Sequence, residues 1–198
     1  MVPCKLILVR HGETVWNQEG RFMGHSDPGL NKKGESQARA VADFLLGEDI
    51  DLLFSSDLVR AVETSRVIAG HNMPIKIISS LREINFGVWE GLTFGEIQTR
   101  YPALLNAWLQ DPFGVRIPGG ETAQEVWHRV IEAWNSIVLN AGGAKTLVIV
   151  AHGGSLRMLL CHLTGKDPSR QWEFNLGHGE PIVLIRNKDT YSVLSNKT

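Results

Sequence analysis

The sequence predicts one α/β domain, a three-layer α/β/α sandwich around a mainly parallel sheet. Along its 198 residues, short and continuously apolar runs alternate with longer amphipathic ones. Unbroken apolar runs are typical of parallel strands that helices cover on both faces. The length fits a single domain spanning residues 1–198, and 43% hydrophobic with 21% charged residues is ordinary for a globular chain.

Six apolar runs are short enough to be strands, and the segments between several of them carry helical patterns. Asn31 is a suitable N-cap for a first helix, which Gly47 is expected to end. Apolar residues at 38, 41, 42 and 45 recur there at helical spacing. Further helices are expected over 57–69 and 155–163. The strands are expected over 5–9, 51–55, 75–79, 146–151, 181–186 and 191–195.

The segment from Thr93 to Asn140 has only helical patterning and predicts a helical insert, at about 93–140, between two core strands. Thr93 with Glu96, and the corresponding pair at 122 and 125, fit the capping box of a helix start. Prolines at 102, 112 and 118 are expected to divide the insert. We expect the aromatic residues in and just before it to pack it mostly onto the sheet: Trp89, Phe94, Tyr101, Trp108 and Phe113.

Composition excludes several classes of protein. Lysine plus arginine number 20 against 21 acidic residues, so the basic excess of a nucleic-acid-binding protein is missing.

Cys4 and Cys161 are far apart and form no CxxC motif, which favours two buried thiols in a reducing compartment. The apolar stretch from Leu6 to Val9 is too short for a signal peptide, and no stretch is long enough to span a membrane. We therefore expect a cytoplasmic protein with no nucleic-acid or membrane partner.

Candidate functional residues follow the predicted strands. The first strand leads into Arg10, His11 and Gly12, and the strand at 146–151 leads into His152 and two glycines that open a helix. Arg60 lies about one turn into the helix after the strand at 51–55. Ligands of parallel α/β sheets bind beyond the carboxyl ends of the strands. Two arginines and two histidines at one such edge suit a phosphate group, because guanidinium groups match phosphate oxygens.

Six sequence motifs follow one another in a fixed order and are spread over nearly the whole chain. They are LVRHGETVWN at 8–17, GHSDPGLNKKG at 24–34, SSDLVRAVET at 55–64, LREINFGVWEG at 81–91, PGGET at 118–122 and VAHGG at 150–154. Together they resemble the histidine phosphatase superfamily, also called the phosphoglycerate mutase-like family. The resemblance implies the phosphoglycerate mutase-like fold. Within the family, the segments are most similar to small α-ribazole phosphatases and broad-specificity phosphatases, and also to metal-independent phosphoserine phosphatases.

The resemblance also implies a catalytic role for individual residues. His11 would be the nucleophile that carries the phosphoryl group, and Glu83 would first protonate the leaving oxygen and then activate water. Arg10, Arg60 and His152 would complete the catalytic set by holding the phosphate oxygens. This chemistry needs positioning and positive charge and no metal or other cofactor. The implied substrate-binding residues are Arg10, Asn17, Gly24, Arg60, His152 and Gly153.

Other polar residues near the motifs receive a structural interpretation. Glu13 is expected to pair with a nearby base, while His25 and His178 are expected to be exposed histidines on loops near the pocket. Two segments depart from the family pattern. Pro28 and Gly29 precede Leu30, where the family has proline directly before leucine, and the segment at 174–184 resembles that of the mutases.

Three functions stay open at this point. The first is a metal-independent phosphomonoesterase acting on a small phosphorylated metabolite, with α-ribazole phosphate as the best single guess. The second is a cofactor-dependent phosphoglycerate mutase, but family mutases have a longer insert than residues 84–151 and an additional C-terminal tail. The third is a non-catalytic domain that binds phosphorylated ligands, which would not need both a nucleophile and an acid. We expect a monomer or homodimer whose partner is the small metabolite.

Overall fold

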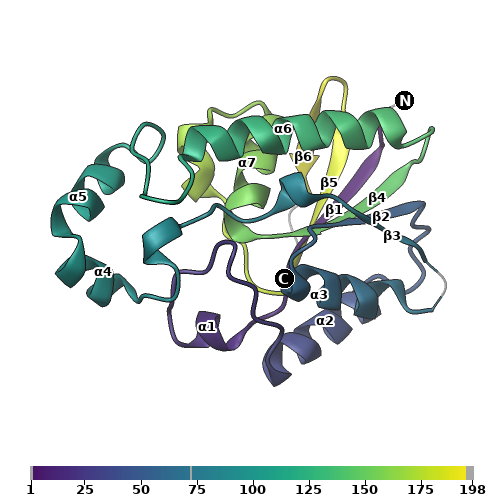
Figure 1. Cartoon of the computed structure of the whole chain (residues 1–198). Coiled ribbons are helices and arrows are strands. Elements are labelled where there is room, and N and C mark those ends of the chain that lie inside the picture. Colours follow the sequence, from purple (N-terminus) through teal and green to yellow (C-terminus); the bar gives the residue numbers. More distant parts are fainter. Residues whose placement is uncertain (1, 72, 195–198) are drawn as a thin grey trace.

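A computed structural model describes residues 2–71 and 73–194, and a six-stranded sheet lies at its centre (Figure 1). The strands lie in the order β3-β2-β4-β1-β5-β6. β1, β2, β3 and β4 are parallel, whereas β5 runs antiparallel to β1 and β6 antiparallel to β5. The predicted mainly parallel sheet is thus confirmed. The strands are β1 (Lys5–Arg10), β2 (Leu52–Ser55), β3 (Ile75–Ile77), β4 (Thr146–Ala151), β5 (Pro181–Asn187) and β6 (Thr190–Val193).

Helices cover both faces of this sheet and form the outer layers of the sandwich (Figure 1). α2 (Lys32–Phe44) and α3 (Val59–Ala69) lie on one face, and α6 (Ala123–Asn140) and α7 (Gly153–Thr164) on the other. Leu6 and Leu8 of β1 belong to the core beneath α6 and α7, while the alternate residues Ile7 and Val9 belong to the core beneath α2 and α3. Because both faces are buried, the strand is apolar throughout.

The predicted helical insert contains two parts with different roles. α6 packs directly on the sheet, whereas α4 (Phe94–Arg100) and α5 (Pro102–Gln110) form a lobe beside it (Figure 1). The lobe has its own core of Trp89, Ile97, Leu105 and Ile117, with Tyr101 and Trp108 packed against it. For Trp89, Tyr101 and Trp108 the expectation of packing onto the sheet is wrong, because these three side chains pack into the core of the lobe. Phe113 does pack against the sheet core, whereas Phe94 is exposed.

The ends of the helices follow from local hydrogen bonds. Both predicted capping boxes are present, Thr93 with Glu96 at α4 and Thr122 with Glu125 at α6. Asn31 caps α2 as expected, but that helix ends at Phe44, before Gly47. Short helices complete the chain: α1 (Val15–Gln18), η1 (Ser79–Leu81), η2 (Gly87–Trp89) and η3 (Pro168–Glu173).

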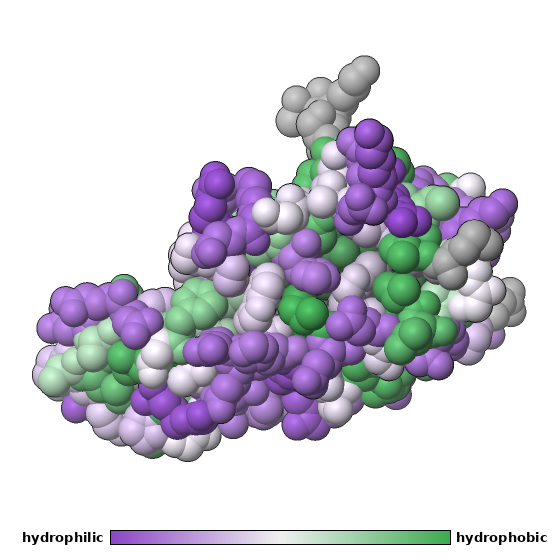
Figure 2. All heavy atoms as spheres, turned by 90° about the horizontal axis from the view of Figure 1, so that it is seen from above, coloured by the Kyte–Doolittle hydropathy of each residue, from purple (hydrophilic) through white to green (hydrophobic). Residues whose placement is uncertain are grey.

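The lobe also stands out from the sandwich on the molecular surface. Figure 2 shows it projecting to the left, with hydrophobic residues among the polar ones on its outside.

The two cysteines differ in burial. Cys161 is buried as predicted, whereas Cys4 is exposed because it precedes the first residue of β1 and lies outside the layers. Among the described residues, no helix is long and apolar enough to cross a membrane.

The shared core of sheet and helices sets the stability of the domain. Ile149 of β4 is fully buried between Leu8 and Phe54 of the neighbouring strands. We expect Ile149→Ala to lower the free energy of unfolding by roughly 2–5 kcal/mol in chemical denaturation, because it leaves a cavity. Leu139→Ala is the control, since Leu139 is 84% exposed. A loss below about 0.5 kcal/mol, as for surface changes, would contradict this packing.

Candidate active site

Three neighbouring strands end at one edge of the sheet and bring the predicted residues together. β1 leads into His11, β4 into His152 and β2 into Ser56. The His11 N–H donates to the carbonyl of Ala151 at 3.0 Å, and the ring centroids of the two histidines are 5.1 Å apart. Nε2 of His152 lies 2.8 Å from Ser56 Oγ. The convergence predicted from the strand ends is therefore present.

His11 is held in one tautomer. Its Nδ1 lies 2.7 Å from the carbonyl oxygen of Gly12, which can only accept, so Nδ1 carries the proton and Nε2 has a free lone pair. The ring is only 2% exposed. Burial, together with the charges of Arg60 and Arg10, holds the pKa of His11 well below its usual range. A neutral imidazole with a free Nε2 is a competent nucleophile.

Arg60 is fully buried and oriented by the loop before α2. Its Nη2 donates to the carbonyl of Gly24 at 2.7 Å, and its Nη1 donates to the carbonyl of Ser26 at 2.9 Å. The carboxylate of Asp27 is 3.5 Å away. Burial lowers the pKa of Arg60 to about 10, so the group keeps its charge at neutral pH. Gly24 thus helps to fix the direction of Arg60 through its carbonyl, and its contact with substrate stays a prediction.

Three buried nitrogens in this region lack protein partners. Arg10 Nε, Arg60 Nε and His152 Nδ1 have no hydrogen-bond partner within residues 2–71 and 73–194. Buried donors are nearly always paired in proteins, so unpaired ones close together call for a ligand. Desolvation lowers the pKa of both Arg10 and His152, the latter well below its usual value. The acceptor oxygens of an anion would satisfy the two arginine nitrogens, and also Nδ1 of His152 when that atom carries the proton.

Glu83 lies at the start of α7, beside this cluster. Its two carboxylate oxygens accept from the N–H of Gly154 at 3.0 and 2.9 Å, and Oε1 also accepts from the N–H of Ile84. A β-carbon on Gly154 would stand 2.3 Å from Glu83 Oε1, so any larger residue there would displace the carboxylate from this position. Gly153 lies beside Arg10, since a β-carbon there would be 3.5 Å from Arg10 Cζ.

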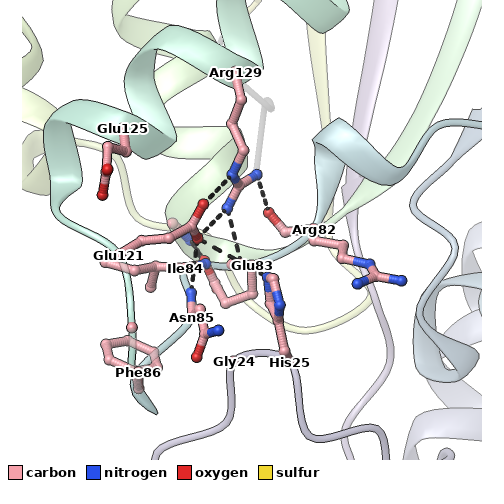
Figure 3. Close-up of polar contacts among 12 residues, drawn as sticks. Gly24, His25, Arg82, Glu83, Ile84, Asn85, Phe86, Glu121, Glu125 and Arg129 are labelled. Atoms are coloured by element: carbon pink, nitrogen blue, oxygen red, sulfur yellow. Dashed lines mark hydrogen bonds and ion pairs between the residues drawn. The ribbon is translucent and has the colours of Figure 1, made fainter. Parts of the chain in front are cut away.

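Arg129 of α6 fixes the backbone around Glu83 (Figure 3). Its guanidinium donates to the carbonyls of Ser80, Arg82 and Glu83 at 2.7–2.9 Å. It also forms two hydrogen bonds with the carboxylate of Glu121, whose Oε2 accepts from the N–H of Asn85. Sequence reasoning missed Arg129: its place among the apolar positions of the helix after PGGET indicated an inward-facing side chain, but nothing in the sequence indicated its partners.

Glu90 is a second residue that the sequence did not single out. Its carboxylate accepts from the N–H groups of His25 and Ser26 at 2.7 and 2.6 Å. It thereby orders the loop whose carbonyls hold Arg60. The position of Glu90 in the WEG triplet could have drawn attention to it. The triplet alone, however, does not indicate that its carboxylate binds the loop at His25 and Ser26.

The remaining predicted residues lie around the cluster. Asn17 accepts from the N–H and hydroxyl of Thr14 at 3.1 Å each and borders a polar hollow, and its contact with substrate stays a prediction. Glu13 pairs with Lys33 at 2.7 Å, as expected. His178 is not an exposed loop residue: its ring centroid is 5.2 Å from that of His11, and Nδ1 donates to the His11 carbonyl.

His178 and His25 are both half-buried because the loops that carry them fold over the site. Burial lowers the pKa of His178 to about 4, helped by the charge of Arg10. Nε2 of His25 lies 3.9 Å from Glu121 Oε2 (Figure 3).

Comparisons with known proteins identify the family of this chain. The family model described as histidine phosphatase superfamily (branch 1) matches residues 6–197. Phosphoserine phosphatase 1 of Hydrogenobacter thermophilus is 36% identical over 181 residues, which cover 91% of this chain and 85% of the relative. A 2,3-bisphosphoglycerate-dependent phosphoglycerate mutase of Methylobacterium radiotolerans is 32% identical, covering 93% and 91% of the two chains.

The fold is also similar to solved structures of phosphatases. The structure of a putative alpha-ribazole-5'-P phosphatase from Escherichia coli superimposes with a TM-score of 0.90 at 28% identity, covering 97% of this chain and 95% of that one. The family model covers nearly the whole chain, and the relative named phosphoserine phosphatase 1 matches it over 85% of its own length. The protein is thus a phosphoric monoester hydrolase, and it belongs to the histidine phosphatase superfamily (branch 1).

Proposed function

We propose that this protein is a metal-independent phosphomonoesterase that hydrolyses a small phosphorylated metabolite through a phosphohistidine on His11. The observation that carries the proposal is the neutral, oriented His11 ring among buried cationic groups whose donors lack partners. A phosphoryl group needs such a nucleophile and such charge stabilisation, and little else from the protein. The side chains that supply the positive charge are Arg10 and Arg60.

The reaction then follows in two steps. Nε2 of His11 attacks phosphorus, the bond from phosphorus to the leaving oxygen breaks, and Glu83 gives its proton to that oxygen. Glu83 next takes a proton from water, whose oxygen attacks phosphorus and breaks the bond to His11. Inorganic phosphate leaves, and both residues return to their starting states. Arg10, Arg60 and His152 hold the phosphate oxygens in both steps.

The substrate that we propose first is α-ribazole phosphate. Support comes from the 0.90 TM-score with the structure described as a putative alpha-ribazole-5'-P phosphatase. The relative named phosphoserine phosphatase, at 36% identity, is the reason to test phosphoserine beside it. We further propose that the protein acts in the cytoplasm as a monomer or homodimer, and that its partner is the small metabolite alone.

A phosphoglycerate mutase is the second candidate, favoured by the mutase relative at 32% identity. A mutase must keep its phosphohistidine away from water until the product is rephosphorylated. Only residues 84–151 separate Glu83 from His152, and much of that segment forms α6 of the sandwich and not a cover. This short cover favours hydrolysis.

The choice between these activities gives a direct prediction. We expect no useful isomerisation of 3-phosphoglycerate, even with 2,3-bisphosphoglycerate present, because water reaches the phosphohistidine. A coupled assay for 2-phosphoglycerate measures this, with phosphate release as the parallel readout. Efficient isomerisation would establish the mutase in place of the phosphatase.

The nucleophile can be tested by deletion of its ring. We expect His11→Ala to reduce hydrolysis of phosphomonoesters by about 10³-fold or more, because no other group can carry the phosphoryl. Circular dichroism checks that the fold is intact, and His128→Ala, at an exposed histidine of α6, is the matched control. Substantial residual turnover in the first variant would show that the mechanism is wrong.

The role of Glu83 is tested by leaving groups of different basicity. Glu83→Gln keeps the size of the side chain but removes its proton, so we expect alkyl phosphates to react about 10²–10⁴-fold more slowly. The p-nitrophenyl ester should lose much less, because p-nitrophenolate leaves without a proton. The measurement is the rate of alcohol or phenolate release in the first turnover, before dephosphorylation limits the rate. Equal losses for the two esters would mean that Glu83 positions phosphate and donates no proton.

A further inference from the structure

A cavity of about 110 Å³ opens beside the carboxylate of Glu83. Its walls come from four parts of the chain that are far apart in sequence. Trp108 lies on α5, Val126 on α6, Met158 on α7 and Trp172 on η3. The cavity is thus built where the lobe meets the sandwich, and it adjoins the residue that protonates the leaving oxygen in the proposed reaction.

The lining is mostly apolar. Phe86, Trp108, Val126 and Met158 contribute hydrophobic surface, and Glu83 and Arg157 are the ionisable groups among the described residues that border the cavity. Apolar pockets bind apolar groups because water leaves both surfaces. Gln171 and the Nε1 of Trp108 are further polar groups of the lining, so a polar group placed there would exchange its full hydration for few partners.

Arg157 is engaged through its Nε and through stacking. Its Nε donates to the carbonyl of Phe174 at 3.1 Å, and its Cζ lies 5.0 Å from the centroid of the Trp172 ring. This stacking presents the indole and guanidinium planes as one wall. An ammonium group, as in phosphoserine, would find only Glu83 as a counter-charge, and the reaction needs that carboxyl for proton transfer.

We propose that this cavity holds the carbon skeleton of the leaving alcohol, and that the preferred substrates are phosphate esters of alcohols that carry an aromatic ring. The inference rests on the proposed phosphomonoesterase function and names its substrate class. Size supports it, since an apolar cavity of about 150 Å³ binds benzene, and this one, at about 110 Å³, is smaller but partly open to solvent. One ring fits the cavity while the phosphate occupies the cluster around His11.

Two esters with nearly identical chemistry test the idea. Ethyl phosphate and 2-phenylethyl phosphate release similar primary alkoxides and differ by one ring. We expect kcat/KM to be roughly 10- to 100-fold higher for the phenylethyl ester, because burial of its large apolar ring stabilises the bound transition state by a corresponding free energy. Phosphoserine is the third substrate, and its electron-poor alcohol is the better leaving group. A higher kcat/KM for the phenylethyl ester than for phosphoserine would therefore reflect binding and not leaving-group chemistry.

Variants of the cavity connect the preference to its walls. Trp172→Ala removes the exposed wall, and Ala123→Leu adds volume to the lining. Both should reduce the ratio of kcat/KM for phenylethyl over ethyl phosphate several-fold. Leu109→Ala is the control, since Leu109 is exposed on α5 next to Trp108 but does not line the cavity. It should leave the ratio as in the parent protein.

The outcomes separate this inference from the function on which it rests. If phosphate esters are hydrolysed in a reaction that needs His11, but ethyl phosphate or phosphoserine is preferred, the inference is wrong and the proposed function stands. An unchanged ratio in both cavity variants would likewise overturn it. If none of the esters is hydrolysed, the proposed function and the inference fail together.

Discussion

The site depends above all on the burial of one positive charge, the guanidinium of Arg60. An ion removed from water costs several kcal/mol unless hydrogen bonds and opposite charge replace the solvent. Here two backbone carbonyls and the carboxylate of Asp27 provide part of that replacement. They leave Nε without a partner in the described part of the chain. The fold therefore holds a cation in place while leaving it incompletely satisfied, which is the state that attracts a phosphate.

That arrangement depends on carboxylates behind the site. Glu90 accepts from the backbone of the loop that carries the Arg60 acceptors, and Glu121 pairs with Arg129, which in turn holds the backbone around Glu83. Groups held in this way need not reorganise when charge develops during phosphoryl transfer. These acidic residues thus stabilise the positions of the groups that the proposed reaction uses.

The sequence was sufficient wherever a local pattern determines structure. Strands buried on both faces are uniformly apolar, and the boxes at Thr93 and Thr122 lie within four residues, so both were predictable. The residues after β1 and β4 were predictable too, because parallel strands end at one edge. Arg129 lies 46 to 49 residues from the carbonyls that it binds, and no local pattern indicates such a pair. The same reason explains why the contact of His178 with His11 was missed.

The separation of sandwich and lobe assigns chemistry and specificity to different parts of the chain. The phosphate cluster is built from strand ends, whose positions are fixed by the hydrogen bonds of the sheet and by a core buried on both faces. The cavity beside Glu83 takes Trp108 from the lobe and Trp172 from a short helix near the surface. Substitutions in those walls change apolar contacts but leave the strand-end hydrogen bonds intact. One phosphoryl-transfer site can therefore serve different leaving alcohols, and in this chain the aromatic and aliphatic walls favour an apolar one.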